Sequence, residues 1–182
     1  MARSDVWDWG LGMHTARSTV SRDGAVHISR AGAGGCDVDI KFRQAELYDA
    51  HRIVPRLRQR DYENLERFGA PVMQVEDALR ISVAAFTAEL DGNVVAMWGV
   101  RATCVLDDRA YLWMLGTPAI EEHPFAFLRY SRVVMRHMRD HYSMLYGEIE
   151  VDYVASIRWL RWLGARILPG PERLMFAFDG RC

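Results

Sequence analysis

The sequence has few of the features that hold secreted or membrane proteins together. Its three cysteines (Cys36, Cys104 and Cys182) are odd in number and widely spaced, with neither zinc-ligand spacing nor a disulfide framework. No apolar run approaches the roughly 20 residues of a membrane span, and Asp5 and Asp8 interrupt the start, where a signal peptide needs an apolar core. We therefore expect a protein of a reducing compartment, with no membrane partner.

The chain also lacks an excess of charge of either sign. Its formal net charge is −1, from 23 Lys and Arg against 24 Asp and Glu. A near-neutral chain has no broad field for polyanions, so its overall charge argues against nucleic acid as a partner. Apolar content is ample, because 50% of the 182 residues are hydrophobic and 26% are charged. This profile is typical of one globular domain with a sizeable core.

The first 35 residues differ in composition from the rest. They are rich in Gly, Ser, Arg and Asp, and they include Trp7 and Trp9. The stretch "AGAGG" (Ala31 to Gly35) then indicates a hinge. We divide the chain into an N-terminal arm, residues 1–35, and one domain, residues 36–182. The arm is either a loose tail or a segment whose tryptophans anchor it to a partner surface.

The first half of the domain mixes strand and helix signals. "CDVDIKF" (36–42) alternates as a strand does, and the helical stretch that follows is divided by Pro55 and stopped by Gly69. The apolar spacing of "VEDALRISVAAF" (75–86) predicts a further helix. "AELDGNVVAMWGV" (88–100) predicts a hairpin that turns at Asp91-Gly92.

The second half of the domain alternates strands and helices. The predicted strands are "AYLWMLGT" (110–117), "YGEIEVD" (146–152) with one acidic face, "ARIL" (165–168) and "RLMFAF" (173–178). Pro124 is well placed to begin a long helix to His141, and a shorter helix spans Ser156–Gly164. The order predicts an α/β fold: one mixed, mainly antiparallel twisted sheet flanked by helices on both faces.

Four segments carry a resemblance to a known family. They are "RLRQRDYENLERFG", "ELDGNVVAMWGV", "LWMLGT" leading into "FLRYSR", and "SIRWLRWLGA". Their order and spacing resemble the GNAT family of N-acetyltransferases. More narrowly, residues 37–178 resemble a phage family of acetyltransferase-like proteins that includes the internal virion protein A of short-tailed phages. The resemblance implies a single GNAT-like domain in which acetyl-CoA enters between splayed strands, here 110–117 and 146–152.

The same resemblance implies where a cofactor would bind. Five positions carry over as cofactor contacts: Leu115, Gly116, Thr117, Arg129 and Arg132. The loop before the long helix, however, departs from the family pattern. "TPAIEEHPF" replaces a glycine-rich phosphate cradle, Pro124 removes one donor, and Glu121 and Glu122 place negative charge beside the expected phosphates. We expect acetyl-CoA binding to be weak or absent.

The catalytic positions depart as well. The family commonly opens the last helix with Asn and places a general-acid Tyr one turn before its end, where this chain has Tyr153 and Leu160. A leucine cannot protonate a thiolate. Glu148, Glu150 and Asp152 either supply a general base or form a solvated strand face. The catalytic candidates are Asp152, which the resemblance places at the mouth of the splayed strands, and Tyr153.

Two further patterns are open to a plainer explanation. His137 and His141 lie four residues apart on the long helix, a spacing that is found in zinc sites. No third ligand is near them in the sequence, so we expect no metal. Arg158, Arg161 and Arg166 fit a solvated face or a protein partner better than RNA in a near-neutral chain.

Two functions from different classes remain. The chain is an acetyltransferase-fold component of a virion or of its assembly, with catalysis lost or vestigial, made in the host cytoplasm and contacting other phage virion proteins. Alternatively, it is a working acetyl-CoA-dependent N-acetyltransferase that modifies a host or phage protein or a small amine. The altered loop before the long helix and Leu160 support the role in a virion. The retained order of strands and helices supports the working acetyltransferase.

Overall fold

The computed structural model describes residues 17–20, 26–29, 40–102 and 108–179. Within these residues one nine-stranded sheet runs in the order β1-β2-β3-β4-β5-β6-β7-β9-β8. The strands are β1 (Arg17–Val20), β2 (Val26–Ser29), β3 (Ile40–Gln44), β4 (Ala84–Leu90), β5 (Asn93–Ala102), β6 (Arg109–Gly116), β7 (Met144–Ile149), β8 (Arg166–Leu168) and β9 (Leu174–Asp179). Among the described strands only β6 and β7 pair in parallel, which confirms the mixed, mainly antiparallel sheet.

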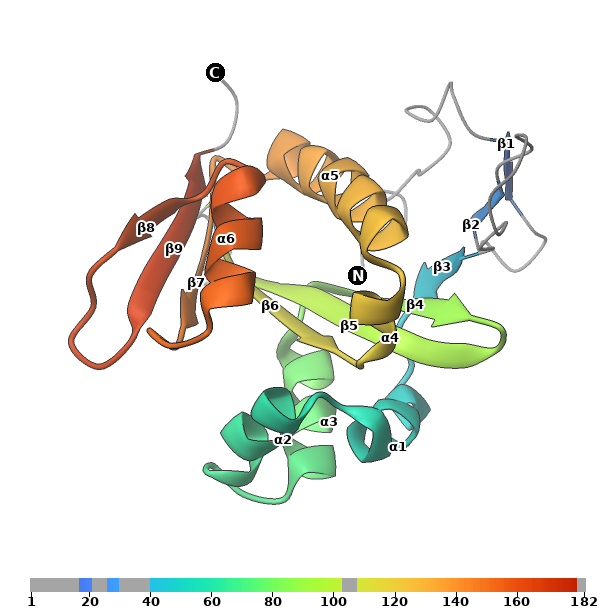
Figure 1. The fold of residues 1–182 in the computed structure, drawn as a ribbon, viewed down its shortest axis with the longest axis horizontal. Helices are drawn as coiled ribbons and strands as arrows, with labels where there is room; N and C mark the ends of the chain where they lie inside the picture. The colour runs from blue at the N-terminus through green and yellow to red at the C-terminus, as the bar shows by residue number, and fades with distance from the viewer. Residues whose placement is uncertain (1–16, 21–25, 30–39, 103–107, 180–182) are drawn as a thin grey trace.

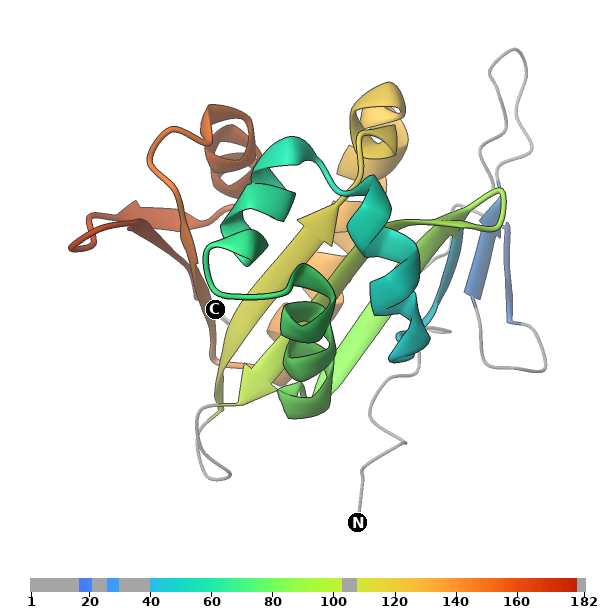
Figure 2. The same cartoon turned by 90° about the horizontal axis from the view of Figure 1, so that it is seen from below.

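Helices cover both faces of this sheet, as the order of elements predicts (Figures 1 and 2). The helices are α1 (Tyr48–Ile53), η2 (Val54–Arg56), α2 (Gln59–Glu66), α3 (Pro71–Ile81), α4 (Ala119–Glu122), α5 (Pro124–His141) and α6 (Val154–Trp162). Helices α1, α2 and α3 lie on one face, and α5 and α6 lie on the other. The sheet therefore has a separate hydrophobic layer on each side.

Local sequence signals account for several element ends. Asp91 and Gly92 both have positive φ, 49° and 74°, the left-handed pair that joins a two-residue hairpin, and β4 and β5 flank them. Pro124 is the first residue of α5, where its fixed φ suits a helix start. Pro55 falls between α1 and α2, and Gly164, with a φ of 97°, follows α6.

Two predicted boundaries differ from the structure. The helix expected over 75–86 ends at Ile81, and Ala84 already pairs with Val100 in the sheet. The strand expected over 146–152 runs instead from Met144 to Ile149. At the first boundary the apolar residues suit helix and strand alike, and pairing with the neighbouring strand decides. At the second, β7 ends with the pair Ile149–Leu174, and the chain turns at residues 151 and 152.

The core has one cluster on each face of the sheet. Between the sheet and helices α5 and α6 lie buried side chains that include Phe42, Trp98 and Met138, and Leu160 and Leu163 join them as their spacing predicts. On the opposite face, α1 and α3 bury Ala50, Ile53 and Val75 against Val94 and Met97 of β5.

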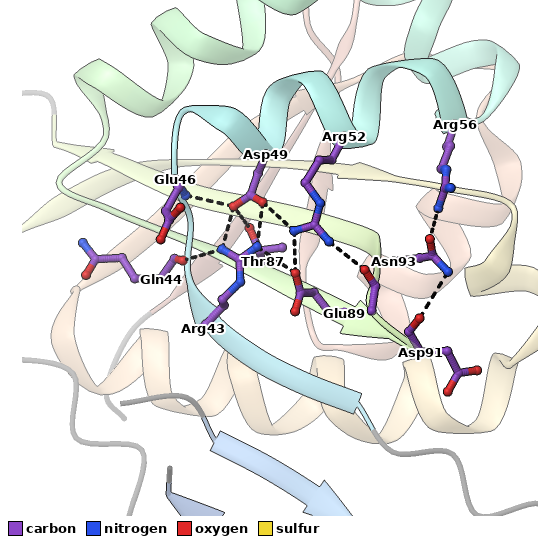
Figure 3. A network of polar contacts seen from close by, with 11 residues as sticks. Arg43, Gln44, Glu46, Asp49, Arg52, Arg56, Thr87, Glu89, Asp91 and Asn93 are labelled. Atoms are coloured by element: carbon purple, nitrogen blue, oxygen red, sulfur yellow. Dashed lines mark hydrogen bonds and ion pairs between the residues drawn. The ribbon is translucent and has the colours of Figure 1, made fainter. Parts of the chain in front are cut away.

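A buried charge cluster fixes α1 to strands β3 and β4 (Figure 3). Asp49 of α1, only 1% exposed, accepts two hydrogen bonds from Arg43 at 2.6 and 2.7 Å and one from the Thr87 hydroxyl at 3.1 Å. Arg43 and Arg52 both donate to Glu89, at 2.8 and 2.6 Å. Burial alone would raise the pKa of Asp49, but the hydrogen bonds, first among them those from Arg43, hold it below its usual value.

The described part of the N-terminal arm extends the sheet. Strand β2 pairs with β3, and β1 pairs with β2, at the edge farthest from β8. Trp7, Trp9 and the predicted start of the first strand at Cys36 lie outside the described residues.

Candidate functional site: a cleft between β6 and β7

Strands β6 and β7 separate partway along their length. They pair only from Arg109–Met144 to Tyr111–Tyr146, although β6 continues to Gly116 and β7 to Ile149. Beyond this point lies a cavity of about 350 Å³ that both strands line. The separation is the one that the family resemblance implies for strands 110–117 and 146–152.

The closed end of the cleft depends on a glycine. Gly147 lies so close to β6 that a Cβ atom there would stand 2.7 Å from the Leu112 carbonyl oxygen, and it would also meet the ring of Phe176. A side chain at this position would push the two strands apart where they should still be in contact. The glycine therefore helps to set where the cleft begins.

Helices α5 and α6 form an apolar wall of the cavity. The Trp159 ring lies 5.2 Å from that of Phe127, and its indole nitrogen donates to the Ser131 hydroxyl at 3.1 Å. Phe127, Met138, Trp159 and Leu160 all line the cavity. Trp159 thus packs one helix on the other and also faces the cleft, whereas Trp162 is 44% exposed.

Helices α5 and α6 run in the same direction. Phe127 of α5 meets Trp159 of α6, and further along both helices Arg132 lies over the Trp162 ring at 4.2 Å. Helix α5 follows the end of β6 and α6 follows the end of β7, beyond the last paired residues of the two strands, so both helices begin at the open mouth of the cleft. Helix α5 ends just before Met144, which pairs with Arg109 in the closed part.

On the opposite side of the sheet, one carboxylate bridges the mouth of the cleft. Asp61 of α2 is 7% exposed and accepts a hydrogen bond from the backbone N–H of Gly116 at 3.1 Å. It also accepts two from Arg58, at 3.0 and 2.9 Å, and one from the Tyr153 hydroxyl at 3.3 Å. Arg58 donates its own backbone N–H to the Gly116 carbonyl at 3.0 Å. Asp61 thereby joins α2, the end of β6 and the start of α6.

Tyr153 keeps its proton at neutral pH. Burial, followed by the negative charge of Asp61, raises the pKa of its phenol to about 12. The guanidinium groups of Arg58 and Arg60 lie over its ring at 5.3 and 5.7 Å. The sequence singled out Tyr153 but not Asp61, whose partners lie 55 and 92 residues away along the chain.

The acidic row on and after β7 is paired with arginine. Asp152 lies in the turn after the strand, 60% exposed at its side chain and 2.7 Å from Arg60. Glu150 contacts Arg67 at 2.7 Å and Arg173 at 3.2 Å. Glu148 lies 3.9 Å from Arg173. Each of these carboxylates already has an arginine partner, so the row resembles a charged rim more than a free catalytic base.

Burial, and next the charge of Glu148, also raises the pKa of Tyr111 on the neighbouring strand. Two phenols that line the cavity, Tyr111 and Tyr153, are therefore protonated at neutral pH.

Four of the five implied cofactor contacts, all but Arg129, are engaged in other interactions. The Thr117 hydroxyl is 4% exposed and donates to the Val95 carbonyl at 3.2 Å. Leu115 packs against the cluster under α1 and α3, on the side away from α5. Arg132 lies over Trp162, and Arg129 is exposed to solvent.

The place of a phosphate cradle is taken by helix α4. Its buried residue Ile120 fills the space beside the Gly116 backbone, where a Cβ atom would clash with it. Glu121 and Glu122 are exposed on the same turn, and Pro124 follows as the first residue of α5. With the Gly116 N–H already bound to Asp61, these residues do not fit the pyrophosphate of coenzyme A.

The remaining candidates have structural roles. Leu160, at the position where the family has its general acid, is 3% exposed and part of the core. The rings of His137 and His141 lie 4.8 Å apart and are tilted by 58°, and Nδ1 of His141 lies 2.9 Å from the His137 carbonyl oxygen. Across the ranges that the structure describes, no group of three His, Cys, Asp or Glu is arranged to hold a metal ion. No helix in those ranges is long and apolar enough to cross a membrane.

Comparison with known proteins places this geometry in a fold. No family model and no curated protein matches the sequence. Among solved structures, the GNAT domain of S. lividans PAT matches with a TM-score of 0.59 at 17% identity, over 92% of this chain and 98% of that one.

Two further structures agree. A ribosomal α-N-protein acetyltransferase in complex with coenzyme A matches with a TM-score of 0.59 at 8% identity, over 78% of this chain and 94% of that one. A GNAT-family acetyltransferase from Streptococcus pneumoniae matches with a TM-score of 0.58 at 13% identity, over 78% and 99%. Identities this low establish the architecture alone. The chain is a single α/β domain with the fold of the GNAT acetyltransferases.

Proposed function

We propose that this protein keeps the cleft of the acetyltransferase fold but does not transfer acetyl groups from acetyl-CoA. The contact that carries the proposal is the hydrogen bond from the Gly116 N–H to the buried carboxylate of Asp61. An amide at this position is a natural donor to an anionic or polar ligand, and here an internal carboxylate uses it. Buried Leu160 at the acid position and the filled space beside Gly116 support the same conclusion.

Calorimetric titration of the full chain with acetyl-CoA tests this proposal. We expect no heat of binding at micromolar ligand, and no thiol release when amines are added. Replacing Glu121 and Glu122 with glycine removes two like charges from the phosphate side, so this double variant should bind better than the parent. The matched control replaces Glu63 and Glu66 of α2, also exposed, and should change nothing. Tight binding by the parent protein would refute the proposal.

A working acetyltransferase is the second candidate, favoured by the position of Tyr153, which lines the cavity at the cleft mouth. A general acid must hold its proton until it is needed, and a phenol is protonated at neutral pH. Asp152 and Glu150 would be the possible bases, once freed from Arg60 and Arg67. Acetyl transfer by the parent protein that is lost in Tyr153→Phe would establish this function instead.

We also propose that the protein is a phage virion or assembly component, synthesised in the host cytoplasm and bound to other virion proteins. The four sequence segments that resemble the phage acetyltransferase-like family support this role. Mass spectrometry of purified particles checks it directly. Absence of the chain from particles and from their assembly intermediates would remove the role, whatever the outcome of the coenzyme titration.

A further inference from the structure

The outer face of α5 carries a row of arginines. Arg129, Arg132, Arg136 and Arg139 follow one another at intervals of three, four and three residues. At 100° per residue these positions fall within one narrow stripe of the helix. Arg158 and Arg161 are exposed on the adjacent helix α6. We call these six residues the α5–α6 arginine face.

These guanidinium groups differ from the arginines on the other side of the sheet. There Arg43, Arg58, Arg60, Arg67 and Arg80 each form an ion pair with a carboxylate within 3 Å. Within the described residues, the arginines of the α5–α6 face form no such ion pair. Arg139 donates to the backbone carbonyl of Asp179 at 3.0 Å, and the Asp179 carboxylate is itself bound by Arg166 at 2.8 Å. Positive charge on this face is therefore largely uncompensated.

A hollow of about 440 Å³ lies in the same face, beside the C-terminal halves of α5 and α6. Arg132, Arg136, Arg139 and Trp162 line it, together with Asp140. Trp162 is 44% exposed, and the Arg132 guanidinium lies 4.2 Å from the centre of its ring. A large aromatic surface is thus held open to solvent beside three cations.

The hollow is distinct from the cleft mouth. Both helices begin at the mouth and run away from it, so Arg136, Arg139 and Gly164 lie at the far end of the pair. The face therefore needs an explanation of its own, independent of acetyl-CoA.

We propose that the α5–α6 arginine face binds single-stranded nucleic acid, with the arginines on phosphates and Trp162 stacked against a base. The row from Arg129 to Arg139 spans ten residues, about 15 Å at 1.5 Å per residue. At 3.4 Å per phosphate, the spacing along one strand when its bases are stacked as in a duplex, this is the length of about four phosphates. Unpaired cations along a groove combined with an aromatic platform are what sequence-independent single-strand binding requires.

The exposed indole favours nucleic acid over an acidic protein. A peptide carboxylate would gain from the guanidinium groups but little from a tryptophan ring. A base offers its own π-face to Trp162 while the arginines, Arg132 first, hold the adjoining phosphates. The net charge of −1 argues against nucleic acid for the chain as a whole, but the fold collects unpaired positive charge on one face.

Fluorescence anisotropy of labelled 12-mers of oligo-U and oligo-dT with the full chain tests the proposal. The variant Arg132→Ala/Arg136→Ala removes two cations, so the slope of log K against log salt concentration should become about 1.4 less steep. The control Arg56→Ala/Arg80→Ala removes the same charge from the α1–α3 side, where both residues are exposed, and should leave the slope unchanged. Circular dichroism melts confirm that both variants fold.

Trp162→Leu separates stacking from charge. It keeps apolar cover beside Arg132 but removes the ring, and it should weaken oligonucleotide binding roughly tenfold with the salt slope unaltered. If polyglutamate competes as well as unlabelled oligo-U and Trp162→Leu has no effect, the face serves an acidic protein and the proposal is wrong. Absence of binding at 50 mM salt, or equal effects of the two double variants, also overturns it.

Discussion

The buried charge cluster at α1 offers the sharpest test of what stabilises this fold. Asp49→Ala removes the carboxylate that Arg43 and Thr87 share, and it leaves Arg43, with only 16% of its side chain exposed, facing Glu89 alone. Breaking a buried ion pair from one side costs about 3–5 kcal/mol. Because Arg43 is not fully buried, solvent offsets part of this, and we expect a loss of about 3 kcal/mol in the free energy of unfolding.

Urea denaturation followed by circular dichroism measures this loss. At about 2–4 °C per kcal/mol for a chain of this size, the midpoint of thermal unfolding should fall by about 6–12 °C. The matched control is Asp77→Ala on α3, whose side chain is 64% exposed and contacts Arg80 at 2.9 Å. Surface pairs contribute about 0–1 kcal/mol, so the control should barely shift the transition. Equal effects of the two variants would refute the reasoning.

The pH dependence of the same cluster has a definite sign. The pKa of Asp49 in the folded protein is lowered, as is that of Glu89. A depressed carboxyl pKa contributes stability that is complete above the unfolded value of about 4 and is lost as the pH falls through the folded value. The parent protein should therefore lose stability more steeply below pH 4 than Asp49→Ala does. If the curves of stability against pH for the two proteins are parallel, the carboxylates of the cluster have the same pKa in the folded and the unfolded protein, and the reasoning is wrong.

The remaining predictions concern the cleft. The difference between the ultraviolet titration curves of the parent protein and of Tyr153→Phe should reveal a phenol with a pKa of about 12. Asp61→Asn should lower the pKa of this phenol, but not to 10, because the phenol stays buried. An ordinary pKa in the parent protein would exclude the buried hydrogen bond. Gly147→Ala should cost about 1–3 kcal/mol, since its Cβ would meet the Leu112 carbonyl oxygen at 2.7 Å. Gly92 has open space around it but a φ of 74°, so Gly92→Ala should cost about 1 kcal/mol through backbone strain. A smaller loss of stability for Gly147→Ala than for Gly92→Ala would show that β6 and β7 can separate at Gly147.

Short-range signals in the sequence determined much of the fold. Asp91-Gly92 specifies its hairpin because two left-handed residues suit few other structures. Pro124 and Gly164 mark helix ends through the φ values that each residue type permits. The order of these elements was enough to predict the mixed sheet, and the family resemblance implied that β6 and β7 are neighbours. Each signal acts within a few residues, so it survives without knowledge of the rest of the chain.

Only the tertiary structure decided what the site contains. Asp61 reaches Gly116 and Tyr153 across 55 and 92 residues, and no local pattern reveals such a meeting. The end of α3 was set by the pairing of Ala84 with Val100, because apolar residues there suit either helix or strand. Charge behaves likewise, because the net charge of a chain says nothing of where its charges lie. In the described residues, arginines paired with carboxylates lie on one side of the sheet, and the arginines of α5, which form no such ion pair, lie on the other. The sequence lists the charges, and the packing of distant segments decides which of them meet a partner.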